Sequence, residues 1–439
     1  MKKTIIITSL LLQGFFVTAP AQQAWTLQQC IDHAVEHNLS VKQYEDAVEQ
    51  QKITLSTTKN RRLPNLSASA NESLGFGRGL TENNTYINRN TQSTSFDIST
   101  NMPLITGGQL PNEIKQRKLD LQAALADLDN AKESVALQVI SAYLEAVCQK
   151  DLVKVAEMQV ELSDAQVKRM QLLFDNKKAS GAELAQIKAT KANDEASLTQ
   201  NRNAYMLALL DLSQLLELPS PENFDVQAPA VDDVNSVVLP LPDAVYSEAL
   251  GLKPQIQAEQ FRLKSAERAV SVAKSAYYPT LYFGAGMGSS YYKMEGARAN
   301  SFGTQLKDNF NRYLSFSLSV PIFNRFATRN SVRAAKVQVH TQQIQLENTR
   351  KALYKSIQQA YYNAVAAQRQ CVSTDVSLAS AREAFALMKT KYENGKANAT
   401  DFQDSKTTLV KAEASAVQAR YTFMFRQRIL DFYRTVNVK

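Results

Sequence analysis

Cysteine, histidine and glycine are scarce in this sequence, and these scarcities exclude several classes of protein. Its three cysteines, Cys30, Cys148 and Cys371, are an odd number that predicts no disulfide framework, so we expect small buried residues in helices. Three histidines leave few general bases. The sequence also has no nucleophile elbow, no His-Glu-x-x-His, no Cys-x-x-Cys and no phosphate loop. We therefore predict no enzyme, no cofactor and no catalytic residue.

A basic stripe is also missing. The formal net charge of +8 comes from acids and bases that are interleaved along helical patterns, and two of the positive charges lie at the N-terminus. Because nucleic-acid binding needs clustered basic residues with stacking aromatics, no nucleic-acid partner is predicted. His33 and His37 have the i, i+4 spacing of a helical metal site. No third ligand is near in sequence, so we expect a surface or interface pair and no metal.

Long apolar runs are absent after the N-terminus, so no helix is expected to cross a bilayer. Residues 5–17 are apolar, follow two lysines and precede a small-residue cleavage site at Ala19-Pro20-Ala21. This run is shorter than the roughly 20 residues of a spanning helix, so residues 1–21 are predicted to be a signal peptide of an exported protein. Leu27-Gln-Gln-Cys30 is not a lipid-attachment box, because its two glutamines are not small.

The sequence predicts two long helical hairpins whose turns are alike. Residues 112–176 contain no proline or glycine, residues 330–392 carry a second helical pattern, and residues 26–60 are expected to form one helix. The hairpin tips fall at about residues 175–182 and 393–399. Each tip is followed by a pair with capping-box spacing: Ser180 with Glu183, and Asn398 with Asp401. A tip built twice in one chain indicates an internal repeat.

Four segments alternate apolar and polar residues, as β-strands do. They lie at about residues 64–76, 92–104, 279–291 and 311–322, and a Gly/Asn-rich loop is expected at residues 75–90. Strands of outer-membrane proteins show this dyad pattern, with apolar residues toward lipid and polar residues toward a lumen. A soluble sandwich would alternate too, but its outer face usually includes Lys and Glu. The residues expected on a lumen face are Ser95, Asp97, Ser99, Ser315, Ser317 and Ser319.

These patterns divide the mature chain into two repeats. The first covers residues 22–218, the second residues 244–439, and a proline-rich connector at residues 219–243 joins them. Four lipid-facing strands cannot close a barrel, since known barrels have about eight or more strands. An open edge in a bilayer would leave backbone groups unsatisfied. The chain is therefore expected to associate with copies of itself, and two, three or more copies satisfy this argument.

The sequence resembles the TolC-like outer-membrane efflux protein family over essentially the whole mature chain. The resemblance is carried by residues 26–31, by the proline motifs before the first strand of each repeat, and by the second tip with Asp401 and Asp404. It implies a mainly α-helical fold with a membrane β-barrel portion. In that fold, a homotrimer forms a 12-stranded barrel in outer-membrane lipid and an α-helical tunnel in the periplasm.

The resemblance also implies functional residues at the tips. Asp401 and Asp404 match the family's acidic pair, and three copies facing the axis would form a cation-preferring channel aperture. The alternative is that Asp401 only caps a helix and Asp404 is only solvated. In the first repeat, Glu183 and Gln186 replace this pair. The residues expected at the tip gate and in the turns are Tyr392, Glu183, Gly395 and Ser180.

The tips depart from the family pattern at two positions. A basic residue that helps to hold the mouth closed is expected at position 397, where this sequence has Ala397. Lys396 is the candidate substitute. Lys177 also stands in the first tip where glycine is usual, which leaves the geometry of that turn open.

The function implied by the resemblance is that of an outer-membrane channel in a tripartite efflux system. Such a channel is a passive exit duct for drugs or other small molecules, which it receives from a periplasmic adaptor and an inner-membrane transporter. The alternative within the same fold is the outlet of a type I protein-secretion system. A soluble periplasmic coiled-coil scaffold is a lesser alternative, which the four alternating strands oppose.

Overall fold

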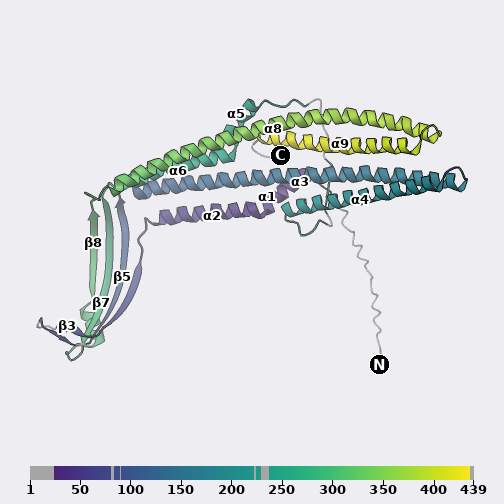
Figure 1. Cartoon of the computed structure of the whole chain (residues 1–439). Helices are drawn as coiled ribbons and strands as arrows, with labels where there is room; N and C mark the ends of the chain where they lie inside the picture. Colours follow the sequence, from purple (N-terminus) through teal and green to yellow (C-terminus); the bar gives the residue numbers. More distant parts are fainter. Residues whose placement is uncertain (1–23, 81–83, 89, 222–223, 229–236, 436–439) are drawn as a thin grey trace, which may run out of the picture. The chain divides into compact units, whose positions relative to one another are not determined.

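The computed structural model describes residues 24–80, 84–88, 90–221, 224–228 and 237–435 (Figure 1). The predicted signal peptide, residues 1–21, and part of the predicted connector lie outside them. The helices are α1 (Leu27–His37), α2 (Leu39–Asn60), α3 (Gln109–Asp175), α4 (Gly181–Leu215), α5 (Pro242–Leu252), α6 (Pro254–Ser275), α7 (Phe302–Asp308), α8 (Ala327–Glu393) and α9 (Ala399–Phe432). The strands are β1 (Ala24–Trp25), β2 (Ser67–Gly75), β3 (Arg78–Leu80), β4 (Tyr86–Asn88), β5 (Thr91–Thr106), β6 (Asp225–Val226), β7 (Thr280–Met294) and β8 (Asn311–Ser319). The predicted fold class, mainly helical with a smaller β portion, is confirmed.

The chain forms two compact units, and the long helices α3 and α8 contribute to both. The first unit contains residues up to 41, residues 132–245 and residues from 358 onward. Its main elements are two hairpins, α3 with α4 and α8 with α9 (Figure 1). Met170 of α3 packs with Leu184 and Ile187 of α4, and Cys371 of α8 packs with Phe423 of α9. Each hairpin is therefore closed by apolar contacts between its own helices.

The second unit contains residues 42–131 and 246–357, and its centre is a four-stranded antiparallel sheet. The strand order is β2-β5-β7-β8, so strands from both halves of the sequence pair in the middle of the sheet. β5 and β7 pair over almost their whole lengths, from Thr91 opposite Met294 to Thr106 opposite Thr280. β2 and β8, nine residues each, are the two edge strands. No helix in the described part of the chain is both long and apolar enough to cross a membrane.

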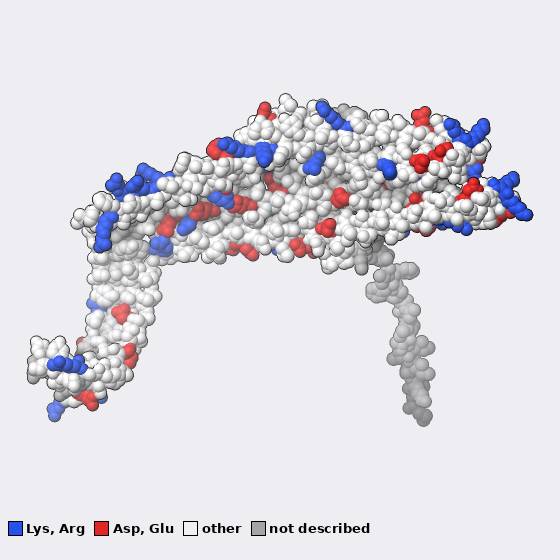
Figure 2. All heavy atoms as spheres, in the orientation of Figure 1, with Lys and Arg blue, Asp and Glu red and all other residues white. Residues whose placement is uncertain are grey.

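The register gives this sheet one apolar and one polar face. Directly opposed residues of an antiparallel pair lie on the same face, and successive residues alternate between faces. One row of opposed residues consists of Met102, Phe283 and Phe316, and the next row consists of Pro103, Tyr282 and Ser317. Apolar side chains therefore gather on one face of the sheet and polar side chains on the other. Figure 2 shows that the visible surface of the sheet carries few charged side chains, whereas charges gather at the hairpin tips.

Glycine in β7 makes room on the polar face. A Cβ atom at Gly286 would lie 2.6 Å from ring atoms of Tyr313 on β8. Real Cβ atoms do not approach other atoms so closely, so the Tyr313 ring lies against the backbone of β7 only because residue 286 has no side chain.

Helix α7 covers the edge of β7 beyond the point where β8 stops pairing at Gly288. The Gln305 side chain accepts a hydrogen bond from Tyr292 N (3.0 Å) and donates one to Tyr292 O (3.0 Å). Asn309 Nδ2 donates to Ser290 O at 2.7 Å. These side chains form the hydrogen bonds with the β7 backbone that a neighbouring strand would otherwise make.

The structure corrects two sequence expectations. The helix expected over residues 26–60 is interrupted at Asn38, whose backbone is extended at φ −62° and ψ 130°. Asn38 Nδ2 donates to Leu215 O at 3.1 Å, and Asn38 Oδ1 accepts from Ser40 N at 2.9 Å, so the side chain stabilises the break. Within the loop expected at residues 75–90, β3 and β4 form a small antiparallel hairpin.

Candidate functional site

The two hairpin tips have the same backbone geometry although their sequences differ. Lys178 N donates to Leu173 O and Lys177 N to Phe174 O, both at 2.8 Å, which is a Schellman motif. In the second tip, Lys396 N donates to Lys391 O (2.8 Å) and Gly395 N to Tyr392 O (3.1 Å). Lys177 and Gly395 occupy the same left-handed position, with φ of 59° and 69°. The first tip thus forms the turn with a lysine where the second uses glycine.

Both tips begin the return helix with a capping residue. Ser180 accepts a hydrogen bond from Glu183 N, and the Glu183 carboxylate accepts from Ser180 N (2.8 Å) and Ser180 Oγ (3.0 Å), a complete capping box. Both hydrogen bonds lower the pKa of Glu183, and the bond from Ser180 N has the larger effect. In the second tip, Asn398 Oδ1 accepts from Asp401 N at 2.7 Å. There the side chain of Asn398 provides the cap.

Asp401 and Asp404 lie in the first turns of α9 and are both exposed. Within the described residues, neither carboxylate takes part in an ion pair or a side-chain hydrogen bond. The side chains that contact these two residues bind backbone groups: Asn398 Oδ1 accepts from Asp401 N, and the Thr408 hydroxyl donates to the Asp404 carbonyl at 2.9 Å. Three residues apart on a helix, the two side chains lie on one face. The chain therefore presents two adjacent free carboxylates beside a hairpin tip.

Tyr392 contacts both hairpins. Its ring stacks on Phe402 of α9, with ring centroids 4.6 Å apart, and the Arg169 guanidinium of α3 lies 5.5 Å from the ring centroid. Arg169 Nη2 also donates to Glu393 O at 2.8 Å. Burial, and to a smaller extent the charge of Glu183, raises the pKa of Tyr392, whereas Arg169 opposes this shift. The sequence pattern missed Arg169, because this residue lies in the other half of the sequence.

The residues expected on the lumen face share one face of the sheet in the observed register. Asp97 is opposite Gly288, Ser99 is opposite Gly286, and Gly284 pairs with Ser315. Ser95, Ser317 and Ser319 follow at steps of two along the same strands. The apolar residues Phe96, Ile98, Leu314, Phe316 and Leu318 occupy the alternate positions.

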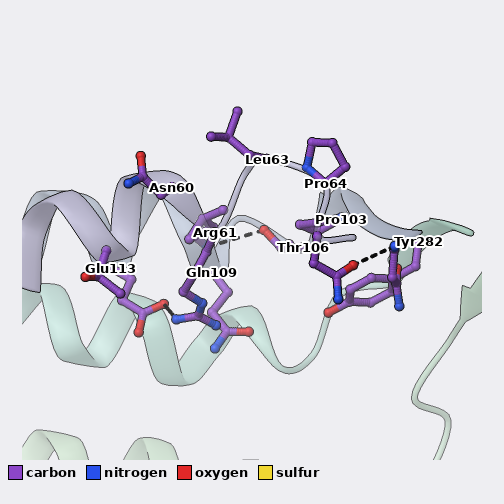
Figure 3. Close-up of a pocket in the computed structure, with 13 residues that line it drawn as sticks. Asn60, Arg61, Leu63, Pro64, Pro103, Thr106, Gln109, Glu113 and Tyr282 are labelled. Carbon is purple, nitrogen blue, oxygen red and sulfur yellow. Dashed lines mark hydrogen bonds and ion pairs between the residues drawn. The ribbon is translucent and has the colours of Figure 1, made fainter. Parts of the chain in front are cut away.

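A pocket of about 480 Å³ lies where this sheet joins the helices of its own unit (Figure 3). The polar-face residues Asn101, Pro103 and Tyr282 line it, together with Arg61 and Glu113. Arg61 Nη1 and Glu113 Oε2 form an ion pair at 2.8 Å, and the figure shows the pair at one side of the pocket. The sequence analysis did not predict this pocket, because its walls come from four separate elements.

His33 and His37 are packed against each other. With Glu36 they form a His-x-x-Glu-His sequence, a ligand spacing found in some zinc enzymes. Their rings stack at 4.2 Å, and His37 Nδ1 lies 3.0 Å from His33 O. Within the part of the chain that the structure describes, no group of three or more His, Cys, Asp or Glu side chains could hold a metal.

Comparison with known proteins matches most of this chain to a family model described as "Outer membrane efflux protein", over residues 30–217 and 245–428. The sequence is 22% identical over 423 residues to the outer membrane efflux protein BepC of Brucella suis, covering 95% of this chain and 87% of that one. It is 23% identical over 450 residues to the outer membrane protein TolC of Escherichia coli, covering 97% and 85%. The crystal structure of the outer membrane protein VceC from Vibrio cholerae has the same fold, with a TM-score of 0.73 at 15% identity over 93% of this chain and 96% of that one.

Proposed function

The chain belongs to the outer membrane efflux protein family, and we propose on this premise that it is the outer-membrane channel subunit of a tripartite efflux system. It provides a passive exit duct for drugs or other small molecules. A periplasmic adaptor and an inner-membrane transporter deliver these molecules to it. Energy comes from the transporter, so this chain needs no catalytic step of its own.

The observation that carries this proposal is the two-faced sheet with open edges. Its apolar face suits lipid and its serine-rich face suits water. The edge strands β2 and β8 have unpaired backbone groups, which would cost several kcal/mol each in a bilayer if they stayed open. Three copies, each contributing four strands, would close a 12-stranded barrel in which every β8 pairs with the β2 of the next copy.

The domain organisation proposed from the sequence fits this assembly. Residues 22–218 and 244–439 are the two repeats, and residues 219–243 connect them. The two segments matched by the family model, residues 30–217 and 245–428, support this division. Each repeat then supplies two strands of the barrel and one hairpin of the periplasmic tunnel.

We assign Asp401 and Asp404 to the channel aperture at the tunnel mouth. Their exposure and their freedom from ion pairs support this role, because carboxylates engaged by nearby cations would be poor cation ligands. Three copies would place six carboxylates around the axis. Tyr392 would hold the two hairpins of one chain together at this mouth, with Arg169 as its cationic partner.

Planar-bilayer conductance tests both the channel and its aperture. The purified protein should form an assembly of three chains that conducts ions and is blocked by hexamminecobalt(III) from the tip side. In the Asp401→Ala/Asp404→Ala variant the block should weaken by about tenfold or more, because the carboxylates that attract the cation are gone. The matched control is Asp211→Ala, which removes an exposed acidic side chain from a different helix, α4. A monomer without conductance would refute the channel, and unchanged block in the double variant would refute the aperture.

A further inference from the structure

A lysine side chain is completely buried between the two hairpins. The side chain of Lys406, on α9, has a relative exposure of 0%. Its Nζ atom lies 2.6 Å from Ser163 Oγ of α3 and 2.8 Å from Asp194 Oδ2 of α4. The Ser163 hydroxyl also hydrogen bonds to the same carboxylate, and Gln159 Nε2 lies 3.5 Å from Asp194 Oδ1. One ammonium group thus links the second hairpin to both helices of the first.

A buried ammonium tolerates only the position in which its partners reach it. Burying a charge is costly unless the charge is paired and hydrogen bonded. Removing one partner of a buried pair leaves an uncompensated charge, which is strongly destabilising. Rotation or sliding of α9 relative to α3 and α4 would separate Lys406 from Ser163 and Asp194. The pair therefore specifies the rotation and the height of α9 against the first hairpin.

Lys406 points away from the carboxylates of the proposed aperture. At 100° per residue, Lys406 lies roughly 170° around the helix from the midpoint of Asp401 and Asp404. One turn before Lys406, Phe402 is also buried, at 3% exposure, and packs on Tyr392 and Phe385 of α8. Phe402 holds α9 to its own hairpin, whereas Lys406 holds it to the other hairpin. The carboxylate pair is left on the opposite, exposed face.

We propose that Lys406 is a positioning residue for the aperture: its buried ion pair with Asp194 orients the carboxylates of Asp401 and Asp404. This inference rests on the proposed channel function and adds a residue that does not itself contact the conducted ions. Loss of the ion pair frees α9 to rotate, so the six carboxylates of the assembly no longer converge.

The test compares Lys406→Met with Lys411→Met in the full-length assembly. Methionine keeps much of the length of lysine without its charge, and Lys411 is an exposed lysine on the same helix. In Lys406→Met the half-blocking concentration of hexamminecobalt(III) should rise about tenfold, equivalent to about 1.4 kcal/mol. Lys411→Met should resemble the wild type. If Lys406→Met is blocked like the wild type, the positioning role is refuted.

A neutral double variant separates positioning from simple stabilisation. Asp194→Asn alone leaves a buried ammonium without a counter-charge, so its thermal midpoint should fall further than that of Lys406→Met. In Lys406→Met/Asp194→Asn no unpaired charge remains, so thermal stability should recover. Cation block should stay weak in this variant, because the ion pair is still missing. Recovery of both properties would show that the pair is only structural and would overturn the proposal.

The same recordings distinguish this inference from the function on which it rests. A wild-type protein without conductance would refute the channel itself. A wild-type channel that is blocked normally, together with Lys406 variants that are blocked equally well, would refute only the positioning role. If Lys406→Met alone fails to assemble, cation block is measured in the neutral double variant instead.

Discussion

Phe316→Arg should prevent assembly in a membrane, whereas Ser317→Arg should be tolerated. The two residues are neighbours on β8, but the register places them on opposite faces of the sheet. Phe316 is opposite Phe283, with ring centroids 5.3 Å apart, and Ser317 is opposite Tyr282. Both variants introduce the same arginine side chain, so their charge and side-chain size are equal. Because the two positions are adjacent on one strand, their depth in the bilayer is also nearly the same.

The expected penalty follows from the apolar face. An arginine on the lipid-facing side near the bilayer midplane costs about 2–4 kcal/mol, falling to about 0–1 kcal/mol near the interfaces. Three copies in one assembly would multiply this cost to about 6–12 kcal/mol at the midplane. An arginine at position 317 would extend into water and keep its hydration. The pair should therefore differ by most of this penalty.

The assay is refolding of the denatured protein into phosphatidylcholine vesicles, followed by urea titration. The folded fraction is measured by resistance to protease and by migration of the intact assembly on gels. Leu314→Arg and Ser315→Arg repeat the comparison two residues earlier on the same strand. If Ser317→Arg proved as damaging as Phe316→Arg, or more so, the assignment of the two faces would be wrong, and the water-filled duct with it.

Three further predictions concern the helical parts of the chain. Lys177→Gly should stabilise the assembly by about 0.5–1 kcal/mol in thermal unfolding, because a left-handed backbone strains a residue with a side chain; a loss of stability would contradict the strain at φ 59°. The ion pairs of Asp164 with Lys168 and Lys191 lower its pKa from 3.8 to about 2. Its stabilising contribution is therefore complete above about pH 4 and lost as the pH falls toward 2, and Asp164→Asn should show a shallower acid loss of the thermal midpoint over that range. Burial raises the pKa of the Cys30 thiol to about 12, so Cys30 should resist alkylation by iodoacetamide at pH 8 until the protein is unfolded; rapid labelling of the native state would contradict its burial.

The tip residues show where sequence reasoning reached the site and where it stopped. Capping spacing pointed to Ser180 and Glu183, because both partners of a capping box lie within four residues of each other. Arg169 was missed because the carbonyl group it binds, that of Glu393, is 224 residues away in sequence. Lys396, the candidate substitute for the missing basic residue, lies in the second tip, whereas the cation beside Tyr392 is Arg169 of the first hairpin. Whether Tyr392 and Glu183 form the tip gate stays a prediction.

The long helices and the two faces of the sheet follow from the amino-acid sequence alone. These features have a local cause: a stretch without proline or glycine continues a helix, and residues two apart in a strand always share a face. Which segments contact one another is known only from the three-dimensional packing. Lys406 would be read as an exposed helical lysine from its neighbours in sequence, but it is buried against Asp194, 212 residues away. No local sequence pattern predicts this pairing, because a buried ion pair depends on how two hairpins pack and not on the residues beside either partner.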